Sequence, residues 1–177
     1  MSSKNRFRRL PPVCALCAML RALARRLRLE RQYVGRVLVM EDGQRFRVFR
    51  HLSLRTSRAG VQGSPAVFVV RFKFARFSQG VNRLLSLIPV PLIGGYPGFR
   101  HKLWMVNEES GYWQGVYEWE SPQDVEAYRR SFALRMMNRR AEPESISYEV
   151  IEQTQLADYV NRRSERPAAG QAGAGPA

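Results

Sequence analysis

The stretch from Gly98 to Pro122 constrains the fold more than any other part of the chain. Residues 99–106 and 112–120 are rich in the aromatic and β-branched side chains that favour strands. Between them Asn107, Ser110 and Gly111 are typical of a short hairpin loop. The sequence therefore predicts an antiparallel hairpin with Asn107 opposite Tyr112, followed by the start of a helix.

Counting back from that loop gives a register and two faces, because strand side chains alternate. One face is predicted to carry Arg100, Lys102, Trp104, Val106, Trp113, Gly115, Tyr117 and Trp119. The other is predicted to carry Phe99, His101, Leu103, Met105, Tyr112, Gln114, Val116 and Glu118. His101 then lies opposite Glu118 among apolar neighbours. This pattern suits a small-molecule pocket, and the alternative is a half-exposed sheet edge with an ordinary His–Glu pair.

The basic character of the chain is confined to its N-terminal third. The chain has 177 residues, 45% of them hydrophobic and 11% aromatic, which predicts one globular domain with extensions. The formal net charge is +14, but residues 1–60 hold 15 Lys and Arg against three acidic residues and so carry +12 of it. The core is therefore nearly neutral, and no nucleic-acid-binding signature is recognisable, which disfavours a nucleic-acid partner.

The cysteines and histidines are too few for a predicted metal site. Cys14 and Cys17 form one CxxC pair, and the histidines are His51 and His101. A zinc site needs further ligands at suitable spacing. A redox dithiol is disfavoured because the pair falls inside a predicted helix, so two small apolar residues on a helix are the preferred interpretation. No apolar run approaches the roughly 20 residues of a spanning helix. We expect a cytoplasmic protein, with a peripheral membrane protein as the alternative.

Residues 1–60 are predicted to form an accessory extension. After Pro11-Pro12, an apolar stripe at helical spacing alternates with arginines and comprises Val13, Leu16, Cys17, Leu20, Leu23, Ala24 and Leu27. Such a basic amphipathic helix either docks on its own domain or a partner subunit, or lies weakly on an anionic membrane. The stripe lacks Trp or Phe anchors, which favours docking. Residues 33–40 and 44–54, joined by Asp42-Gly43, predict a hairpin.

The rest of the chain predicts an α+β core over residues 66–153. A strand is predicted at 66–76, a helix at 79–88, an apolar loop at 90–97, and the central hairpin follows. A helix begins at Pro122, capped by Ser121, and continues through Val125, Tyr128, Phe132 and Met136 at helical spacing, with Arg139-Arg140 in its last turn. With a strand at 144–153, the order is the ferredoxin-like β-α-β-β-α-β. Residues 55–65 read as a linker, 156–163 as a short helix and 164–177 as a disordered tail. The uncovered sheet face predicts a homodimer, and a chain starting near Ser64 is expected to stay folded and dimeric.

The core resembles the dimeric α+β barrel proteins that include antibiotic-biosynthesis-type monooxygenases, and most closely the YdhR-like monooxygenases. The resemblance covers about half of the chain and rests on Pro97-Gly98-Phe99, Lys102-Leu103-Trp104, Gly115-Val116-Tyr117 and Ala127-Tyr128. It implies a homodimer. It also implies an enzyme that oxidises phenolic or quinoid aromatic compounds with molecular oxygen, without a bound metal or flavin; other members of the fold bind haem or have no demonstrated activity.

A cofactor-independent oxygenase needs a group that removes a proton from the substrate, so that the resulting anion supplies the electrons to oxygen in a dry cavity. On the predicted second face His101 would accept the proton and Glu118 would orient it. Tyr112 and Gln114 would bind substrate oxygens, with Leu103 and Met105 as apolar walls. The alternative is a non-catalytic ligand-binding or scaffold dimer with a basic surface-binding N-terminal segment.

Overall fold

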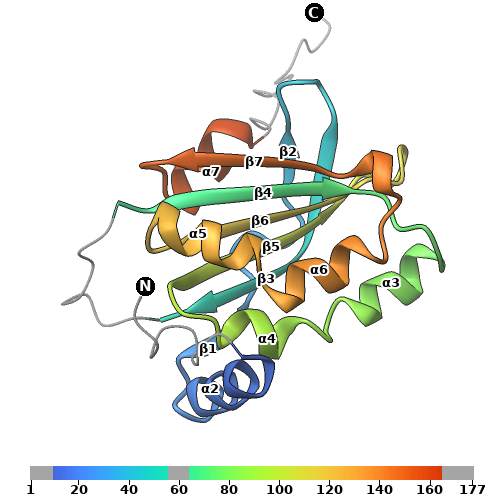
Figure 1. The fold of residues 1–177 in the computed structure, drawn as a ribbon. Helices are drawn as coiled ribbons and strands as arrows, with labels where there is room; N and C mark the ends of the chain where they lie inside the picture. The colour runs from blue at the N-terminus through green and yellow to red at the C-terminus, as the bar shows by residue number, and fades with distance from the viewer. Residues whose placement is uncertain (1–9, 56–63, 165–177) are drawn as a thin grey trace, which may run out of the picture.

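The computed structural model describes residues 10–55 and 64–164 and shows one seven-stranded antiparallel sheet with helices on both faces (Figure 1). The strands are β1 (Leu27–Glu30), β2 (Val37–Val39), β3 (Arg45–Leu54), β4 (Ala66–Phe72), β5 (Phe99–Val106), β6 (Trp113–Trp119) and β7 (Ser147–Glu152). The helices are α2 (Pro11–Leu23), α3 (Gln79–Leu85), α4 (Val90–Gly94), α5 (Pro122–Arg129), α6 (Phe132–Asn138) and α7 (Leu156–Arg163), with a 3₁₀ turn at Pro143–Ser145. Most of the predicted linker, 56–63, and the predicted disordered tail after Ser164 lie outside the described residues.

The predicted ferredoxin-like core is confirmed. β4, α3, β5, β6, α5 and β7 follow one another in the expected order, and the four core strands lie side by side as β5-β6-β4-β7. The predicted N-terminal hairpin is also confirmed, because β2 pairs with β3. β3 in turn pairs with the outer edge of β5, so the extension continues the core sheet. That residues 64–164 fold without the first 60 residues stays a prediction.

The register of the central hairpin is as predicted, with one local exception. Lys102 lies opposite Tyr117 and Trp104 opposite Gly115. The register shifts between Phe99 and His101. This irregularity turns Phe99 onto the face covered by α4 and α5, where its ring lies 5.8 Å from that of Trp119. The predicted placement of Phe99 beside His101 is therefore wrong.

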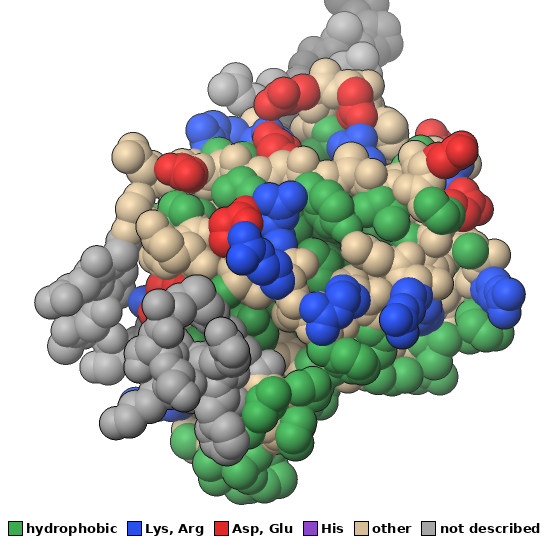
Figure 2. Space-filling view, viewed as in Figure 1, with side chains coloured by type: hydrophobic (Ala, Val, Ile, Leu, Met, Phe, Trp, Pro, Cys, Tyr) green, Lys and Arg blue, Asp and Glu red, His purple; other side chains and the backbone are tan. Residues whose placement is uncertain are grey.

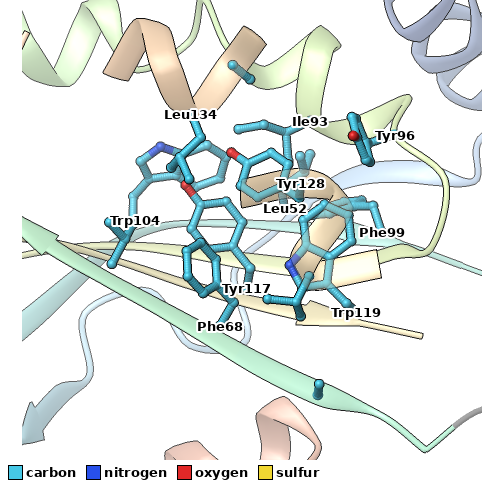
Figure 3. Close-up of a cluster of buried hydrophobic side chains, with 14 of the residues drawn as sticks. Leu52, Phe68, Ile93, Tyr96, Phe99, Trp104, Tyr117, Trp119, Tyr128 and Leu134 are labelled. Carbon is cyan, nitrogen blue, oxygen red and sulfur yellow. The ribbon is translucent and has the colours of Figure 1, made fainter. Parts of the chain in front are cut away.

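The two faces of the sheet bury separate apolar clusters. Under α4, α5 and α6 the rings of Trp119 and Tyr128 lie 4.7 Å apart, at the centre of the aromatic group drawn in Figure 3. On the other face, α7 and the segment before β3 cover the sheet, and the cluster there includes Leu38, Val67, Leu103, Met105, Val116, Leu156, Tyr159 and Val160. The homodimer was expected because this face seemed uncovered. That premise is wrong, since the chain covers the face itself, and the oligomeric state stays a prediction.

Two predicted helix boundaries are also wrong. Residues 90–97, predicted as a loop, contain α4, because a proline in the first helical turn lacks only an N–H that needs no partner there. The helix predicted to run from Pro122 past Met136 is two helices. It breaks at Ser131, whose hydroxyl accepts a hydrogen bond of 3.2 Å from the Leu134 N–H and so caps α6. Phe132, which was expected to continue the apolar stripe, is 47% exposed.

α2 lies against α4 of its own domain, as the docking interpretation predicted, but through a different face. Cys14 and Ala18 face the domain and are buried. Three leucines of the predicted stripe point away from it and are 52%, 55% and 74% exposed: Leu16, Leu20 and Leu23. The face with the small residues packs against α4, in preference to the leucine stripe, because small residues let the two helices approach closely. Among the described residues, no helix is both long and apolar enough to cross a bilayer.

The close approach of α2 and α4 depends on glycine. A Cβ atom at Gly95 would lie 1.7 Å from the carbonyl oxygen of Cys14, so any side chain there collides with the backbone of α2. Arg21 fixes the same contact, because its guanidinium donates a hydrogen bond of 2.6 Å to the carbonyl oxygen of Gly94. The position of α2 is therefore set by backbone contacts rather than by its leucines.

We predict that Gly95→Ala displaces α2, since overpacking a close contact costs about 1–3 kcal/mol. Burial raises the pKa of the Cys14 thiol to about 11, so this thiol should react slowly with a thiol reagent while α2 is docked. In Gly95→Ala it should react much faster. Gly80→Ala is the matched control, because a Cβ there meets nothing within 4 Å. Equal rates in the two variants would contradict the close contact.

Candidate functional site

His101 and Glu118 lie opposite each other across β5 and β6, as predicted, but their side chains have other partners. The Glu118 carboxylate accepts a hydrogen bond of 2.7 Å from the backbone N–H of Leu156 at the start of α7. A carboxylate there complements the exposed N–H groups of the helix terminus. Burial lowers the pKa of His101, and the charge of Glu118 opposes that shift only in part.

The side-chain partner of His101 is the other histidine of the chain. Nε2 of His51 on β3 lies 3.3 Å from Nδ1 of His101 on β5. Nδ1 of His51 is buried without a hydrogen-bond partner, and burial lowers the pKa of His51 to about 4. Both rings are therefore neutral at neutral pH. This pair was not predicted, because it depends on the pairing of β3 with β5, for which the local sequence carries no signal.

The other predicted substrate-binding residues do not converge on His101. Gln114 is four residues from Glu118 along β6, a distance of roughly 13 Å. Its side-chain oxygen accepts a hydrogen bond of 3.0 Å from Arg71, and it lines a separate polar cleft of about 260 Å³. Tyr112 is half-buried, with the Lys73 ammonium 4.6 Å from its ring centroid. The remaining two, Leu103 and Met105, are fully buried in the cluster under α7.

The opposite face of the same strands holds a second cavity, of about 50 Å³, between the sheet and α6. Its walls are mainly aromatic rings and methionines, among them Phe72, Phe74, Trp104, Trp113, Tyr117, Met136 and Met137. The polar residues that line it are Lys102, Ser86, Arg140 and Gln114, the last of which also lines the polar cleft, and no lining residue is acidic. Apolar walls with a few basic groups are suited to an aromatic molecule that carries an acidic group.

Lys102 is the most perturbed group of this cavity. Its side chain is buried, and Nζ lies 4.1 Å from the ring centroid of Trp104 and 4.4 Å from that of Tyr117. The rings favour the ammonium form. Burial outweighs them and lowers the pKa of Lys102 well below 10.5, with the nearby charge of Arg50 as a second cause. Within the described residues the amine makes no hydrogen bond or ion pair, so it is available to a ligand.

Two arginines flank the cavity, and both are held by neutral groups. The Arg50 guanidinium donates to the Ser86 hydroxyl, and the Arg140 guanidinium donates a hydrogen bond of 3.0 Å to the side-chain oxygen of Asn82. Burial lowers the pKa of each arginine. Because no carboxylate in the cavity wall neutralises these cations, the electrostatic environment favours a bound anion.

Gly115 makes room for the aromatic wall beside Lys102. A Cβ atom there would lie 2.8 Å from the Tyr117 ring, so the ring folds over the backbone of its own strand at a point where only glycine fits. Tyr128 donates a hydrogen bond to the Tyr117 hydroxyl, and burial raises the pKa of both phenols. The wall formed by Tyr117 and Tyr128 is thus neutral at neutral pH, and the titratable group next to it in the cavity is Lys102.

The described residues contain no group of three or more His, Cys, Asp or Glu side chains placed to hold a metal ion. Neither Cys14, which is buried, nor Cys17, which is half-buried, forms a disulfide.

The signal for this cavity was present in the sequence but was not used. The predicted register already placed Lys102 on the face with Trp104, Trp113 and Tyr117, and a lysine with aromatic neighbours on a strand of the core is unusual enough to mark a site. Arg140 and Ser86 come from distant segments, and only the packing of α3 and α6 on the sheet brings them to the cavity.

No protein-family model matches the sequence, and no curated protein matches it. Solved structures do. A ferredoxin-fold protein from Listeria monocytogenes related to antibiotic biosynthesis monooxygenases is 9% identical, with a TM-score of 0.49 over 66% of this chain and 69% of that chain. A monooxygenase-like protein from Listeria innocua is 10% identical, with a TM-score of 0.48 over 66% of this chain and 68% of that chain.

A heme-degrading enzyme from Listeria monocytogenes is 10% identical, with a TM-score of 0.46 over 77% of this chain and 93% of that chain. These likenesses concern the path of the backbone and assign no role to a side chain of this chain. The ferredoxin-like fold that the sequence resemblance implied is present, as the strand order shows independently.

We predict that the neutral histidine pair makes the fold sensitive to acid. His51 has a pKa of about 4 in the fold and about 6.5 unfolded, so its contribution is complete above pH 6.5 and is lost as the pH falls toward 4. The loss should reach about 3 kcal/mol. The groups that face the pair, Glu30 and Glu118, only partly offset it.

The measurement is urea unfolding at pH 7 and pH 4, compared with His51→Gln. The variant removes the titrating ring and should lose less stability than the wild type on acidification. Carboxylates elsewhere contribute equally to both proteins, so the difference isolates the histidine. Parallel pH profiles would show that the pair does not titrate as described.

Proposed function

We propose that this protein is an oxygenase-type enzyme that oxidises a planar aromatic substrate in the cavity between the sheet and α6, with Lys102 as the base. The observation that carries the proposal is a buried lysine with a strongly lowered pKa among aromatic rings, in a cavity without acidic side chains. The resemblance of the core to the antibiotic-biosynthesis-type monooxygenases motivates the reaction class.

The proposed reaction begins with proton transfer. Neutral Lys102 accepts a proton from an acidic C–H or O–H group of the substrate, and the resulting ammonium pairs with the substrate anion. The anion gives its electrons to molecular oxygen, and a carbon–oxygen bond forms. The peroxide anion then takes the proton back from the Lys102 ammonium. For a CH₂ group flanked by aromatic rings, the hydroperoxide loses its second C–H proton while the O–O bond breaks and hydroxide leaves, which gives a carbonyl and one water molecule. One oxygen atom enters the product, the other leaves as water, and the substrate supplies all the electrons.

The surrounding residues serve this chemistry by excluding water and by favouring negative charge. Arg50 and Arg140 add positive charge near Lys102 while their own hydrogen bonds go to neutral groups. The aromatic walls keep the cavity dry, which strengthens the interaction between the substrate anion and the ammonium.

The cavity of about 50 Å³ must enlarge to admit a polycyclic substrate. Met136 and Met137 on α6 are half-buried in its wall and are the adaptable side chains that would move. Substrate entry is therefore proposed from the side of α6.

His101 is the rival base, on the other face of the sheet. It lies one residue from Lys102, so the two side chains point in opposite directions from the same strand. The buried His51–His101 contact and the use of the Glu118 carboxylate by α7 speak against this assignment. A pair of single substitutions therefore tells which face of the sheet is the catalytic one.

We predict that Lys102→Met lowers kcat/KM by about 10²–10⁴-fold, as loss of a general base does, whereas His101→Gln leaves it unchanged. The measurement is oxygen uptake with a panel of anthrones and hydroquinones. In the wild type, kcat/KM should rise with pH through a value well below 10.5, where Lys102 loses its proton. Loss of activity in His101→Gln with retention in Lys102→Met would move the site to the other face.

Methionine matches lysine in length and removes a buried amine, so Lys102→Met should fold at least as stably as the wild type. A melting curve controls for this. If the wild type consumes no oxygen but an aromatic ligand quenches the fluorescence of Trp104 and Trp113 in a Lys102-dependent way, the chain is instead a non-catalytic ligand-binding protein.

A further inference from the structure

An apolar surface is left uncovered where α2 and the α3–α4 segment lie next to each other. Figure 2 shows hydrophobic side chains along the lower edge of the molecule, over α2 and α3 as placed in Figure 1. The six residues that define this leucine surface are 52% to 74% exposed: Leu16, Met19, Leu20, Leu23, Leu84 and Ile88. An exposed apolar patch of this kind marks an interaction site more often than a chance surface.

The outward direction of the leucine surface is fixed by contacts on the other sides of its helices. α2 is already fixed on α4 by Cys14, Gly95 and the hydrogen bond from Arg21, so its leucines are held outward by contacts on its opposite side. α3 is likewise capped by Ser78 and held through the buried Asn82, which leaves Leu84 facing solvent. Rigid presentation of apolar side chains is what docking to a flat apolar phase requires.

The described segments that build the surface carry basic side chains and no acidic ones. Residues 10–29 contain four arginines and no acidic residue, and residues 64–107 contain no acidic residue either. Glu108, just beyond the second segment, pairs with Arg83 of α3. Arg25, Arg26 and Arg28 directly follow α2 and are exposed. The two segments that build the leucine surface are thus free of negative charge, although the whole chain has 15 acidic residues.

We propose that the leucine surface docks this protein on an anionic membrane, with the leucines among the lipid chains and the arginines at the headgroups. A second copy of the chain is the other candidate occupant. A two-fold contact through the same surface would bring the arginine runs of two copies together, where like charges repel. An anionic lipid surface instead attracts each arginine by about 1 kcal/mol.

The docked orientation also brings the cavity around Lys102 near the membrane, from which an apolar substrate can enter. Ser86 and Pro89 line that cavity and belong to the segment that carries Leu84 and Ile88 on its outer side. An apolar aromatic substrate that partitions into the bilayer would thus reach the cavity wall nearest the membrane. This link rests on the proposed function, whereas the docking itself does not.

The test is co-sedimentation of the full chain with vesicles of phosphatidylcholine alone or mixed with phosphatidylglycerol. We expect binding to the mixed vesicles that weakens as salt is raised, and little binding to phosphatidylcholine. Leu20→Gln/Leu84→Gln should weaken binding to the mixed vesicles at least about tenfold, because two exposed leucines no longer enter the lipid. Arg25→Gln/Arg26→Gln should weaken it about 30-fold.

Matched controls separate this surface from general effects of charge and apolarity. Arg139→Gln/Arg162→Gln removes the same charge from exposed positions on other helices, and Val150→Gln removes an exposed apolar side chain from β7; both should bind as the wild type does. Because vesicle binding is measured without turnover, an inactive enzyme that binds vesicles refutes only the proposed function.

Three results would overturn the docking proposal. The first is no binding to phosphatidylglycerol vesicles at low salt. The second is an equal loss of binding in the control variants. The third is a stable dimer in solution that Leu20→Gln/Leu84→Gln dissociates, which would assign the surface to a second copy.

Discussion

Burial of β5 on both faces is the constraint on which the account depends. Side chains alternate along a strand, so His101 and Lys102, adjacent in sequence, enter different environments. His101 meets a second histidine on β3, and Lys102 meets aromatic rings in the cavity between the sheet and α6. In each case burial acts against a positive charge, and both groups lose basicity. Lys102 lines the cavity between the sheet and α6.

The fold was largely predictable because its signals are local. The alternation of apolar residues predicts the strands. The Asn107–Gly111 loop predicts the register of the hairpin, and the Ser121 cap predicts the start of a helix, each within a few residues. The two helix predictions that were wrong, at α4 and at Ser131, also depend on local sequence. Proline allowed either a loop or the first turn of a helix, and serine allowed either the interior or the start of a helix, and packing decided between them. The irregularity at Phe99 is of the same kind.

The candidate site was less predictable because its members come from distant segments. Arg140 and Ser86 reach the cavity through the docking of helices, and His51 reaches His101 through a strand pairing across about a quarter of the chain. Glu118 illustrates the converse error. Its position opposite His101 was predicted correctly. Its carboxylate instead accepts a hydrogen bond from a backbone N–H at the N-terminus of α7, since unpaired N–H groups need a partner. The apposition of His101 and Glu118 among apolar neighbours is what made that face the predicted site.

In the proposed reaction, burial lowers the pKa of Lys102 well below 10.5, and its neutral amine receives a proton from the substrate. The most direct test is an NMR titration of lysine side chains labelled with ¹³C at Cε, with Lys102→Met to assign the signal. We predict that Lys102 titrates well below 10.5 in the free protein and that a phenol that resists oxidation shifts this pKa upward on binding. A Lys102 that titrates at or above the ordinary lysine value, unaffected by the phenol, would contradict it.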